Sequence, residues 1–566
     1  MVGFVFFSLQ QSPIQLATMA KWDDLALELR TQIWNNLSTD ARRRRNLAAD
    51  NPELREDKKW YFARANYALV CRDWQGFFEK ECLRSLILTY ERVDWLNQMV
   101  PPHKRHLVKH IWLWVKLPHY HVHEYLYTST KEHSQEYREA RVFTGAVCGL
   151  FRSLSSWETT HGQGHGVTLE LTVYSPSDKA HGLTNGCFGD RFFIPFEWTG
   201  KEYLDDPDES WVFHARRYPQ FDHMYDRTLP ALAKLHGLKE EAPNLPRAFR
   251  LLNRDIPYRV PVVTRFLIRR QYYRAISTDT LRQMLENLPG LERITYEMHR
   301  THPTVSGERD QGCTLLLERL LSTSDIKRLS LYEEAGEGWG FNIERSGGLY
   351  VPLGRMLGAG TGNLEELSLS HLVDAKDFFY EFFPQKNSID GDQPQPRPYW
   401  RNLRSLAITS KVLGWVGHGW NGGQARDNTS LDELLTAVAK ALASMPKLEI
   451  LEIWNAESGQ ENWTARTAAQ GAIFRYERHS RDNGSPTLTW CSSWDTSLSS
   501  GVIEAWKDAA SQLDARRDIV VENRMMKPLK TQGSILPLLK LRSLILDEVS
   551  LYQVEWEAET IERFRN

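Results

Sequence analysis

A short leucine phrase of the form Leu-x-x-Leu-x-Leu recurs along this chain and constrains its fold more than any other feature. Six copies occur, with Ile or Tyr replacing Leu at some positions. They are Leu291 to Tyr296, Ile326 to Leu331, Leu364 to Leu369, Leu403 to Ile408, Leu448 to Ile453 and Leu541 to Leu546. Successive copies start 35, 38, 39, 45 and 93 residues apart. Because alternating apolar residues are typical of strands, the phrases predict a repeated β-strand.

Several copies follow a run with helical periodicity. In the clearest case a helix is expected from Leu431 to Ser444, and Met445-Pro446 separates it from the strand that follows. A helix-then-strand unit cannot bury the apolar face of its strand alone, so such units stack side by side. The predicted fold class is therefore α/β, with a curved parallel sheet backed by helices.

Other segments extend this predicted repeat domain to residues 83–566. Further strand-like runs are Leu83 to Leu88, Val108 to Val115, Val167 to Tyr174, Val262 to Ile268, Ile473 to Tyr476, Leu488 to Trp490 and Ile519 to Glu522. Asp482-Asn483-Gly484 predicts a hairpin within the longest gap between phrases. Stretches predicted to be mobile inserts are Arg300 to Gly312, Gln385 to Pro398 and Gly414 to Asn428.

The N-terminal region predicts a helical module at residues 19–82, after a tail at residues 1–18. A first helix is expected from Trp22 to Leu37 and a second from about Trp60 to Cys82, because apolar residues recur three or four positions apart. Two or three such helices can close a small bundle.

The module resembles the F-box, whose pattern opens with Leu-Pro-x-Glu, continues with Ile or Leu and a further Leu, and ends near Val-Cys-Arg-x-Trp. The matching residues, in order, are Leu25, Glu28, Ile33, Leu37 and Val70-Cys71-Arg72-Asp73-Trp74. Ala26 replaces the usual proline, and an insertion that contains Arg42 to Arg45 separates the two halves. Because a short basic run in a loop is usually solvated, these arginines predict no nuclear signal.

This resemblance implies a substrate-recognition adaptor of a Skp/cullin/F-box ubiquitin ligase. The residues expected to dock on a Skp-family adaptor are Leu25, Leu29, Ile33, Leu37, Val70 and Trp74. A helix-in-groove contact needs a few large apolar anchors of this kind. The same side chains could instead form the internal core of a helical cap, and the chain would then be a repeat scaffold or receptor without a ligase role.

The repeats resemble leucine-rich repeats, although their spacing drifts and the Asn or Cys that usually follows the strand is not regularly present. The combination with the module is similar to F-box proteins of filamentous fungi. Along such a strand, side chains alternate between the two faces of the sheet. The residue between the last two apolar positions and the residue that follows them therefore point toward an open concave face. The residues expected to bind a protein target there are Ser330, Tyr332, Ser368, Ser370, Thr409, Glu452 and Trp454. The alternative is a face that is merely solvated or covered by an insert.

Composition and charge exclude several other classes of function. With 70 basic and 72 acidic side chains, the net charge of −2 offers no bulk attraction for nucleic acid or anionic lipid. After the short apolar stretch at residues 1–9, no segment reaches the run of about 18 apolar residues that spans a bilayer. The six cysteines are scattered, which is typical of reduced thiols in the cytoplasm or nucleus.

Catalytic, metal and cofactor sites are not predicted. His119, His121 and His123 alternate before Glu124, but one isolated histidine cluster is more often structural than a metal site. His161 and His165 lie in a Gly-rich loop and are interpreted in the same way. The run from Gly358 to Gly362 lacks the Lys-Ser/Thr of a phosphate loop and predicts a turn between a helix and the next strand. An enzyme that uses the histidine-rich segment is the third and weakest hypothesis.

Overall fold

The computed structural model divides into two compact units, Met1–Arg84 and Ser85–Asn566, here called unit 1 and unit 2. The described residues are 22, 25–37, 66–119, 132–157, 166–175, 251–252, 256–270, 276–299, 303–323, 325–334, 351–384, 397–414, 429–457, 469–478, 485–513 and 518–555. The predicted tail at residues 1–18, the hairpin turn at 482–484 and most of the insertion in the module lie outside them.

Unit 1 contains a helix at residues 27–37 and the helix α4, Arg72–Arg84. The prediction of one helix from Trp60 to Cys82 is wrong, because a turn at residues 68–71 interrupts it. The amide of Gln75 donates to the carbonyl of Cys71 at 2.8 Å, so the helical bonding of α4 begins there. Asp73 in the first turn favours a start at this point through its interaction with the helix dipole.

Unit 2 is built on one sheet of twelve strands whose spatial order follows the sequence. The strands are β1 (Ser85–Leu88), β2 (His110–Lys116), β3 (Val167–Tyr174), β4 (Val263–Ile268), β5 (Arg293–His299), β6 (Arg328–Glu334), β7 (Glu366–Ser370), β8 (Ser405–Thr409), β9 (Ile450–Glu457), β10 (Gln470–Glu477), β11 (Thr487–Ser492) and β12 (Val520–Met525). Neighbouring strands are parallel, except that β10 is antiparallel to both β9 and β11. The predicted α/β class is confirmed.

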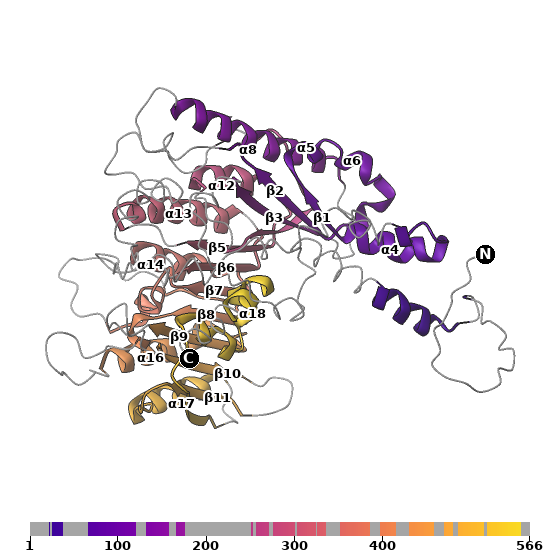
Figure 1. Ribbon diagram of the computed structural model, residues 1–566. Helices are drawn as coiled ribbons and strands as arrows, with labels where there is room; N and C mark the ends of the chain where they lie inside the picture. The colour runs from indigo at the N-terminus through magenta and orange to yellow at the C-terminus, as the bar shows by residue number, and fades with distance from the viewer. Residues whose placement is uncertain are drawn as a thin grey trace, which may run out of the picture. The chain divides into compact units, whose positions relative to one another are not determined.

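Helices cover one face of this sheet. Figure 1 shows α12, α13, α14, α16 and α17 along the same side of the strands. The helical segments of unit 2 before the end of the chain are α5 (Tyr90–Val93), α6 (Leu96–Met99), η2 (Pro102–Leu107), α8 (Glu132–Leu154), α12 (Thr278–Glu286), α13 (Pro303–Thr323), α14 (Val351–Gly360), α15 (Ala375–Phe378), η6 (Tyr380–Phe382), η7 (Lys411–Leu413), α16 (Thr429–Ala441), η8 (Leu442–Ser444) and α17 (Ser500–Leu513). Two more, η9 (Gln532–Leu538) and α18 (Arg542–Ile545), lie on the opposite face.

Large aromatic side chains fill the layer between the helices and the sheet. Trp400 stacks on Phe378 with ring centroids 5.4 Å apart, and its indole N–H donates to the hydroxyl of Thr361 at 3.0 Å. Trp506 of α17 packs on Phe474 of β10 at 5.1 Å. The indole N–H of Trp506 donates to the carbonyl of Leu435 at 3.0 Å, so these two tryptophans are buried with their single donor satisfied.

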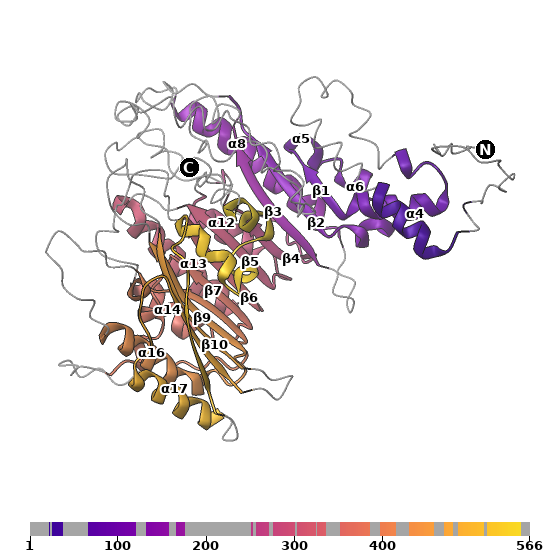
Figure 2. The same ribbon diagram turned by 60° about the horizontal axis from the view of Figure 1, so that its bottom comes forward.

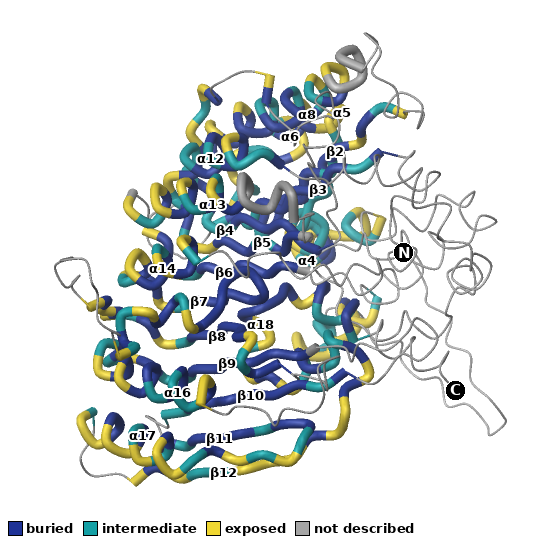
Figure 3. The backbone as a smooth tube through the Cα atoms, turned by 90° about the vertical axis from the view of Figure 1, so that its left-hand side faces the viewer, coloured by how far each residue is buried: buried dark blue, intermediate teal, exposed yellow. Residues whose placement is uncertain are grey.

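The opposite face of the sheet is covered by the end of the chain. Residues 526–555, here called the C-terminal segment, contain η9, α18 and a helix that starts at residue 548. η9 contacts β9 and β10, and α18 contacts β6 and β7. Figure 2 shows this yellow segment crossing in front of the strands, and Figure 3 shows that most strands are buried along their length.

Five of the six leucine phrases form strands as predicted, and the seven other strand-like runs also contribute strands. The sixth phrase, Leu541 to Leu546, is not a strand: it contains the helical turn α18. It lies on the face of the sheet, where Leu544 and Ile545 are buried, rather than in the plane of the sheet.

Two predictions about glycine-rich stretches had different outcomes. Arg300 to Gly312 was expected to be an insert, but α13 begins at Pro303, so that prediction is wrong. A Cβ on Gly312 would lie 2.4 Å from Oγ1 of Thr278, so this glycine permits close packing of α13 against the start of α12. The turn predicted from Gly358 to Gly362 does lie between α14 and β7, but Gly358 to Gly360 still belong to α14, so the turn starts only after Gly360. The predicted inserts at 385–398 and 414–428 lie almost entirely outside the described residues.

Candidate functional site

In the described part of unit 1, the aromatic side chains pack together and form a core. Trp34 and Trp74 are buried, and Trp22 lies 5.6 Å from the first and 5.3 Å from the second between ring centroids. Phe77 stacks on Trp34 at 5.2 Å. An ion pair of 3.1 Å between Arg30 and Asp73 joins the two helices at the surface. The tryptophans therefore hold the two helices together.

The aliphatic side chains of unit 1 divide between its surface and its core. Leu29, Ile33 and Val70 are 50%, 37% and 58% exposed. Leu25 and Leu37 are partly buried, and Leu37 packs against the tryptophan core. Trp74, predicted as a docking residue, is only 6% exposed, so its predicted role as a surface anchor is wrong.

Two exposed leucines in unit 1 were not among the predicted docking residues. Leu27 is 59% exposed and Leu69 is 83% exposed. Leu69 immediately precedes the Val-Cys-Arg-x-Trp pattern and lies with Val70 in the turn before α4. Helical periodicity could not identify it, because its turn interrupts the helix on which the periodicity was based.

The seven residues predicted to bind a target are all buried in unit 2. Tyr332 and Trp454 are 4% and 1% exposed, and both belong to a core cluster that includes Ile535 and Ile545 of the C-terminal segment. Ser330, Ser368, Ser370, Thr409 and Glu452 are also buried. The face was expected to be open, and that expectation is wrong because the C-terminal segment covers it.

A group of charged side chains lies beneath the C-terminal segment at β2 to β5. This polar cluster consists of His110, Glu170, Arg265, Arg269, Glu297 and Asp547. Arg269 lies 3.1 Å from both Glu170 and Asp547, and Arg265 lies 3.0 Å from Asp547. The ring of His110 is hydrogen-bonded to Glu170 at 2.8 Å. The cluster therefore joins the four strands β2 to β5 to the C-terminal segment.

The charges of the polar cluster determine its protonation. Burial would lower the pKa of Arg269, but the carboxylates of Glu170, Asp547 and Glu297 together raise it. Burial opposes ionisation of Asp547, and the two arginines outweigh it and lower the pKa of that carboxyl. The third carboxyl group of the cluster, Glu297, behaves differently, because burial and the Asp547 carboxylate raise its pKa to about 7. Glu297 therefore gains or loses its proton near neutral pH.

An aromatic group lies where strands β6, β7 and β9 end. The ring of His371 makes edge contacts with Tyr332 and Trp454, at 5.9 and 4.9 Å between centroids. Its backbone is left-handed, with φ of 60°, and its amide donates to the hydroxyl of Thr409 at 2.7 Å. Three residues predicted to bind a target therefore pack or bond within the chain.

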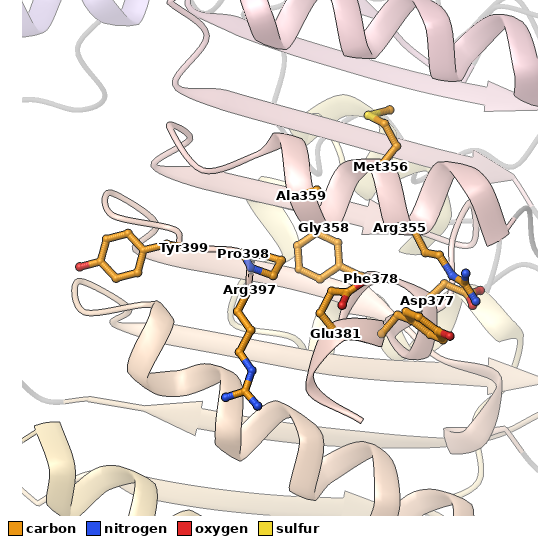
Figure 4. A pocket seen from close by; sticks show the side chains of 11 residues that line it. Arg355, Met356, Gly358, Ala359, Asp377, Phe378, Glu381, Arg397, Pro398 and Tyr399 are labelled. Atoms are coloured by element: carbon orange, nitrogen blue, oxygen red, sulfur yellow. The ribbon is translucent and has the colours of Figure 1, made fainter. Parts of the chain in front are cut away.

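A hollow of about 510 Å³ lies on the helical side of unit 2, between α14, α15 and residues 397–399. Figure 4 shows Arg355 beside Asp377 at one end and Tyr399 at the other. The guanidinium of Arg355 stacks 3.5 Å from the ring centroid of Tyr380. Arg355 and Arg397 are matched by two acidic side chains in the lining, so the hollow has no net charge that would select a ligand.

The described residues hold no group of three or more His, Cys, Asp or Glu side chains that could bind a metal ion. His119 is described and exposed, whereas His121, His123, Glu124, His161 and His165 lie outside the described part. Among the helices that the structure describes, none combines the length and the apolar character needed to cross a membrane.

Comparison with known proteins identifies one matching family. The family of unknown function DUF6546 matches residues 321–547, from the end of α13 through β12 to Asp547 in the C-terminal segment. The match thus contains strands β6 to β12 and the part of the segment that covers them. None of the curated proteins matches the chain.

Proposed function

We propose that this chain is a substrate-recognition adaptor of a Skp/cullin/F-box ubiquitin ligase. Unit 1 would dock on a Skp-family adaptor, and unit 2 would hold the protein target. The observation that supports the proposal is the exposure of Leu29, Ile33, Leu69 and Val70 on unit 1, at or beside positions that resemble the F-box.

The partition of apolar side chains in unit 1 supports a docking role. Its tryptophans already fill the core, so the exposed aliphatic side chains contribute little to stability in the free chain. Burying one such side chain against a partner yields about 1.5 to 3 kcal/mol. Because a few anchors of this kind carry most of the energy of a helix-in-groove interface, four exposed aliphatic side chains are enough to form one.

The proposed activity requires no catalytic side chain from this chain. An adaptor that holds a target beside a charged ubiquitin-conjugating enzyme raises the effective concentration of the target's lysines. The chain would be intracellular, and its function would depend on two protein interfaces. The alternative is a repeat scaffold without a ligase role, for which unit 1 needs no partner.

The test is capture of a purified Skp-family adaptor by the purified full-length chain. We expect the wild type to bind and a double variant, Leu29→Asp with Ile33→Asp, to bind about 700-fold more weakly, since two lost anchors at about 2 kcal/mol each cost about 4 kcal/mol. Leu315→Asp is the matched control, because Leu315 is 61% exposed but lies on α13 of unit 2.

Three outcomes separate the proposals. Loss of binding in the double variant with retention in Leu315→Asp supports docking through unit 1. Failure of the wild-type chain to bind the adaptor would reject the ligase role and favour the scaffold. Equal binding by all three proteins would reject the assigned surface. Circular dichroism of each variant verifies that its helices remain folded.

A further inference from the structure

Side chains of the sheet in unit 2 hold the C-terminal segment largely through its main chain. The carboxylate of Glu452 accepts hydrogen bonds from the amides of Lys540 and Leu541, at 3.1 and 2.9 Å. The hydroxyl of Ser330 donates to the carbonyl of Ile545 at 3.0 Å. Glu297 accepts the amide of Asp547 at 2.6 Å. Main-chain amides and carbonyls are common to all peptides, so these contacts do not depend on the sequence of the segment.

Two charged side chains of the segment contact the sheet: Lys540, which is half-exposed and lies 2.7 Å from Glu477 of β10, and Asp547, which is buried. The carboxylate of Asp547 lies 3.0 Å from Arg265 and 3.1 Å from Arg269, and its side chain is only 3% exposed. A buried arginine without its carboxylate is strongly unfavourable, so this position requires an acidic group. The sheet therefore combines general recognition of a peptide main chain with a specific requirement for one acid.

The geometry points to a peptide-binding site: we propose that Arg265, Arg269, Glu297, Ser330 and Glu452 bind an acidic peptide segment of a partner protein. Residues 540–550 of the chain occupy this site until the partner displaces them. In the bound partner, an aspartate or glutamate takes the place of Asp547. The site would receive the target of the ligase proposed above, but its test does not involve the Skp-family adaptor, so the two proposals fail independently.

The strand pairing of the sheet does not depend on residues 540–550. They contribute no strand to the twelve-stranded ladder, so every strand keeps its pairing when they move. Arg542, Ser543 and Glu548 are exposed on the outer side of the segment, so solvent already reaches that side. The surface beneath the segment is charged near β3 to β5, but near β6 and β9 it carries Tyr332 and Trp454, which pack with Ile545. A partner peptide must therefore supply apolar side chains at that end of the site.

The experiment uses the full-length chain and two fluorescent peptides. One copies residues 538–551, and the other carries Asp547→Asn. The chain is tested as wild type and as Asp547→Ala, which weakens the hold on its own segment. We expect Asp547→Ala to bind the acidic peptide at least 10-fold more tightly than the wild type does, and to bind the Asn peptide at least 10-fold more weakly than the acidic one.

A third chain, Asp547→Ala with Arg269→Gln, tests the charge requirement. It should lose the preference for the acidic peptide. Equal affinity of Asp547→Ala for both peptides would overturn the proposal, as would absence of binding. If Asp547→Ala does not fold, hydrogen exchange of the wild type decides: the amides of Leu541 and Asp547 should exchange at least 10-fold faster than those of β6 and β7. Exchange of both sets at the same rate overturns the proposal.

Discussion

Replacing Asp547 with Asn isolates the charge that fastens the C-terminal segment to the sheet. Asn keeps the volume of Asp and its ability to cap the helix that follows, where the side chain of Asp547 accepts from the amide of Val549 at 3.3 Å. The substitution removes only the ion pairs with Arg265 and Arg269 and leaves Arg269 with Glu170 as its remaining ion-pair partner within 4 Å among the described residues.

The expected loss is about 3 kcal/mol at pH 6, at the lower end of the cost of breaking a buried ion pair because Glu170 still partners Arg269. At about 1.4 kcal/mol per factor of ten, the protection of the amides of Asp547 and Leu551 against hydrogen exchange should fall about 100-fold.

The effect should be smaller at pH 8 than at pH 6. The Asp547 carboxylate is one cause of the raised pKa of Glu297, so its removal lowers that pKa and makes ionised Glu297 less costly near Arg269. Hydrogen exchange of wild type and variant at both pH values measures this. A loss under about 1 kcal/mol, or one of equal size at both pH values, would refute the electrostatic reasoning.

Three further predictions concern single residues. The pKa of Glu297 is about 7 in the folded chain and ordinarily 4.5, so the free energy of unfolding should be highest below pH 4.5 and fall by about 3 kcal/mol as pH rises through 7. Glu297→Gln should abolish this pH dependence, which urea denaturation at a series of pH values measures. Trp34→Ala should destabilise unit 1 by about 3 to 5 kcal/mol and Ile33→Ala by under about 1, measured by urea unfolding. Gly312→Ala should destabilise by about 1 kcal/mol, whereas Gly76→Ala, with no atom near its Cβ, should stabilise by about as much; melting temperatures distinguish these signs.

The leucine phrases predicted the sheet because they report a local property. A strand with apolar residues at alternate positions must bury that face, and stacked helix-strand units provide the partner. The predicted runs at 167–174 and 262–268, which lie outside the phrases, became strands for the same reason.

One hexapeptide shows where local patterns become insufficient. Leu-Arg-Ser-Leu-Ile-Leu occurs at residues 83–88 and again at 541–546. In the first copy Ser85–Leu88 form β1, whereas in the second Arg542–Ile545 form α18. Since the letters are identical, tertiary context selects the structure: β2 offers the first copy an edge to pair with, and the second packs on a completed face.

The position of the functional surfaces also depended on distant residues. Periodicity identified the face of the sheet that carries Ser330 and Glu452, but not the segment that covers it. Ser330 bonds to a residue 215 positions further along the chain, and Glu452 to one 88 positions further. In unit 1 the spacing of Ile33 and Trp34 could not show which side chain faces inward. That choice depends on Phe77, which comes from another helix.

Hydrogen exchange of the full-length chain, with and without a purified Skp-family adaptor, tests the proposed docking most directly. The proposal predicts added protection at residues 27–37 and 66–71, which carry the exposed Leu29, Ile33, Leu69 and Val70, and unchanged exchange in the strands of unit 2. No added protection anywhere, or protection confined to unit 2, would contradict it.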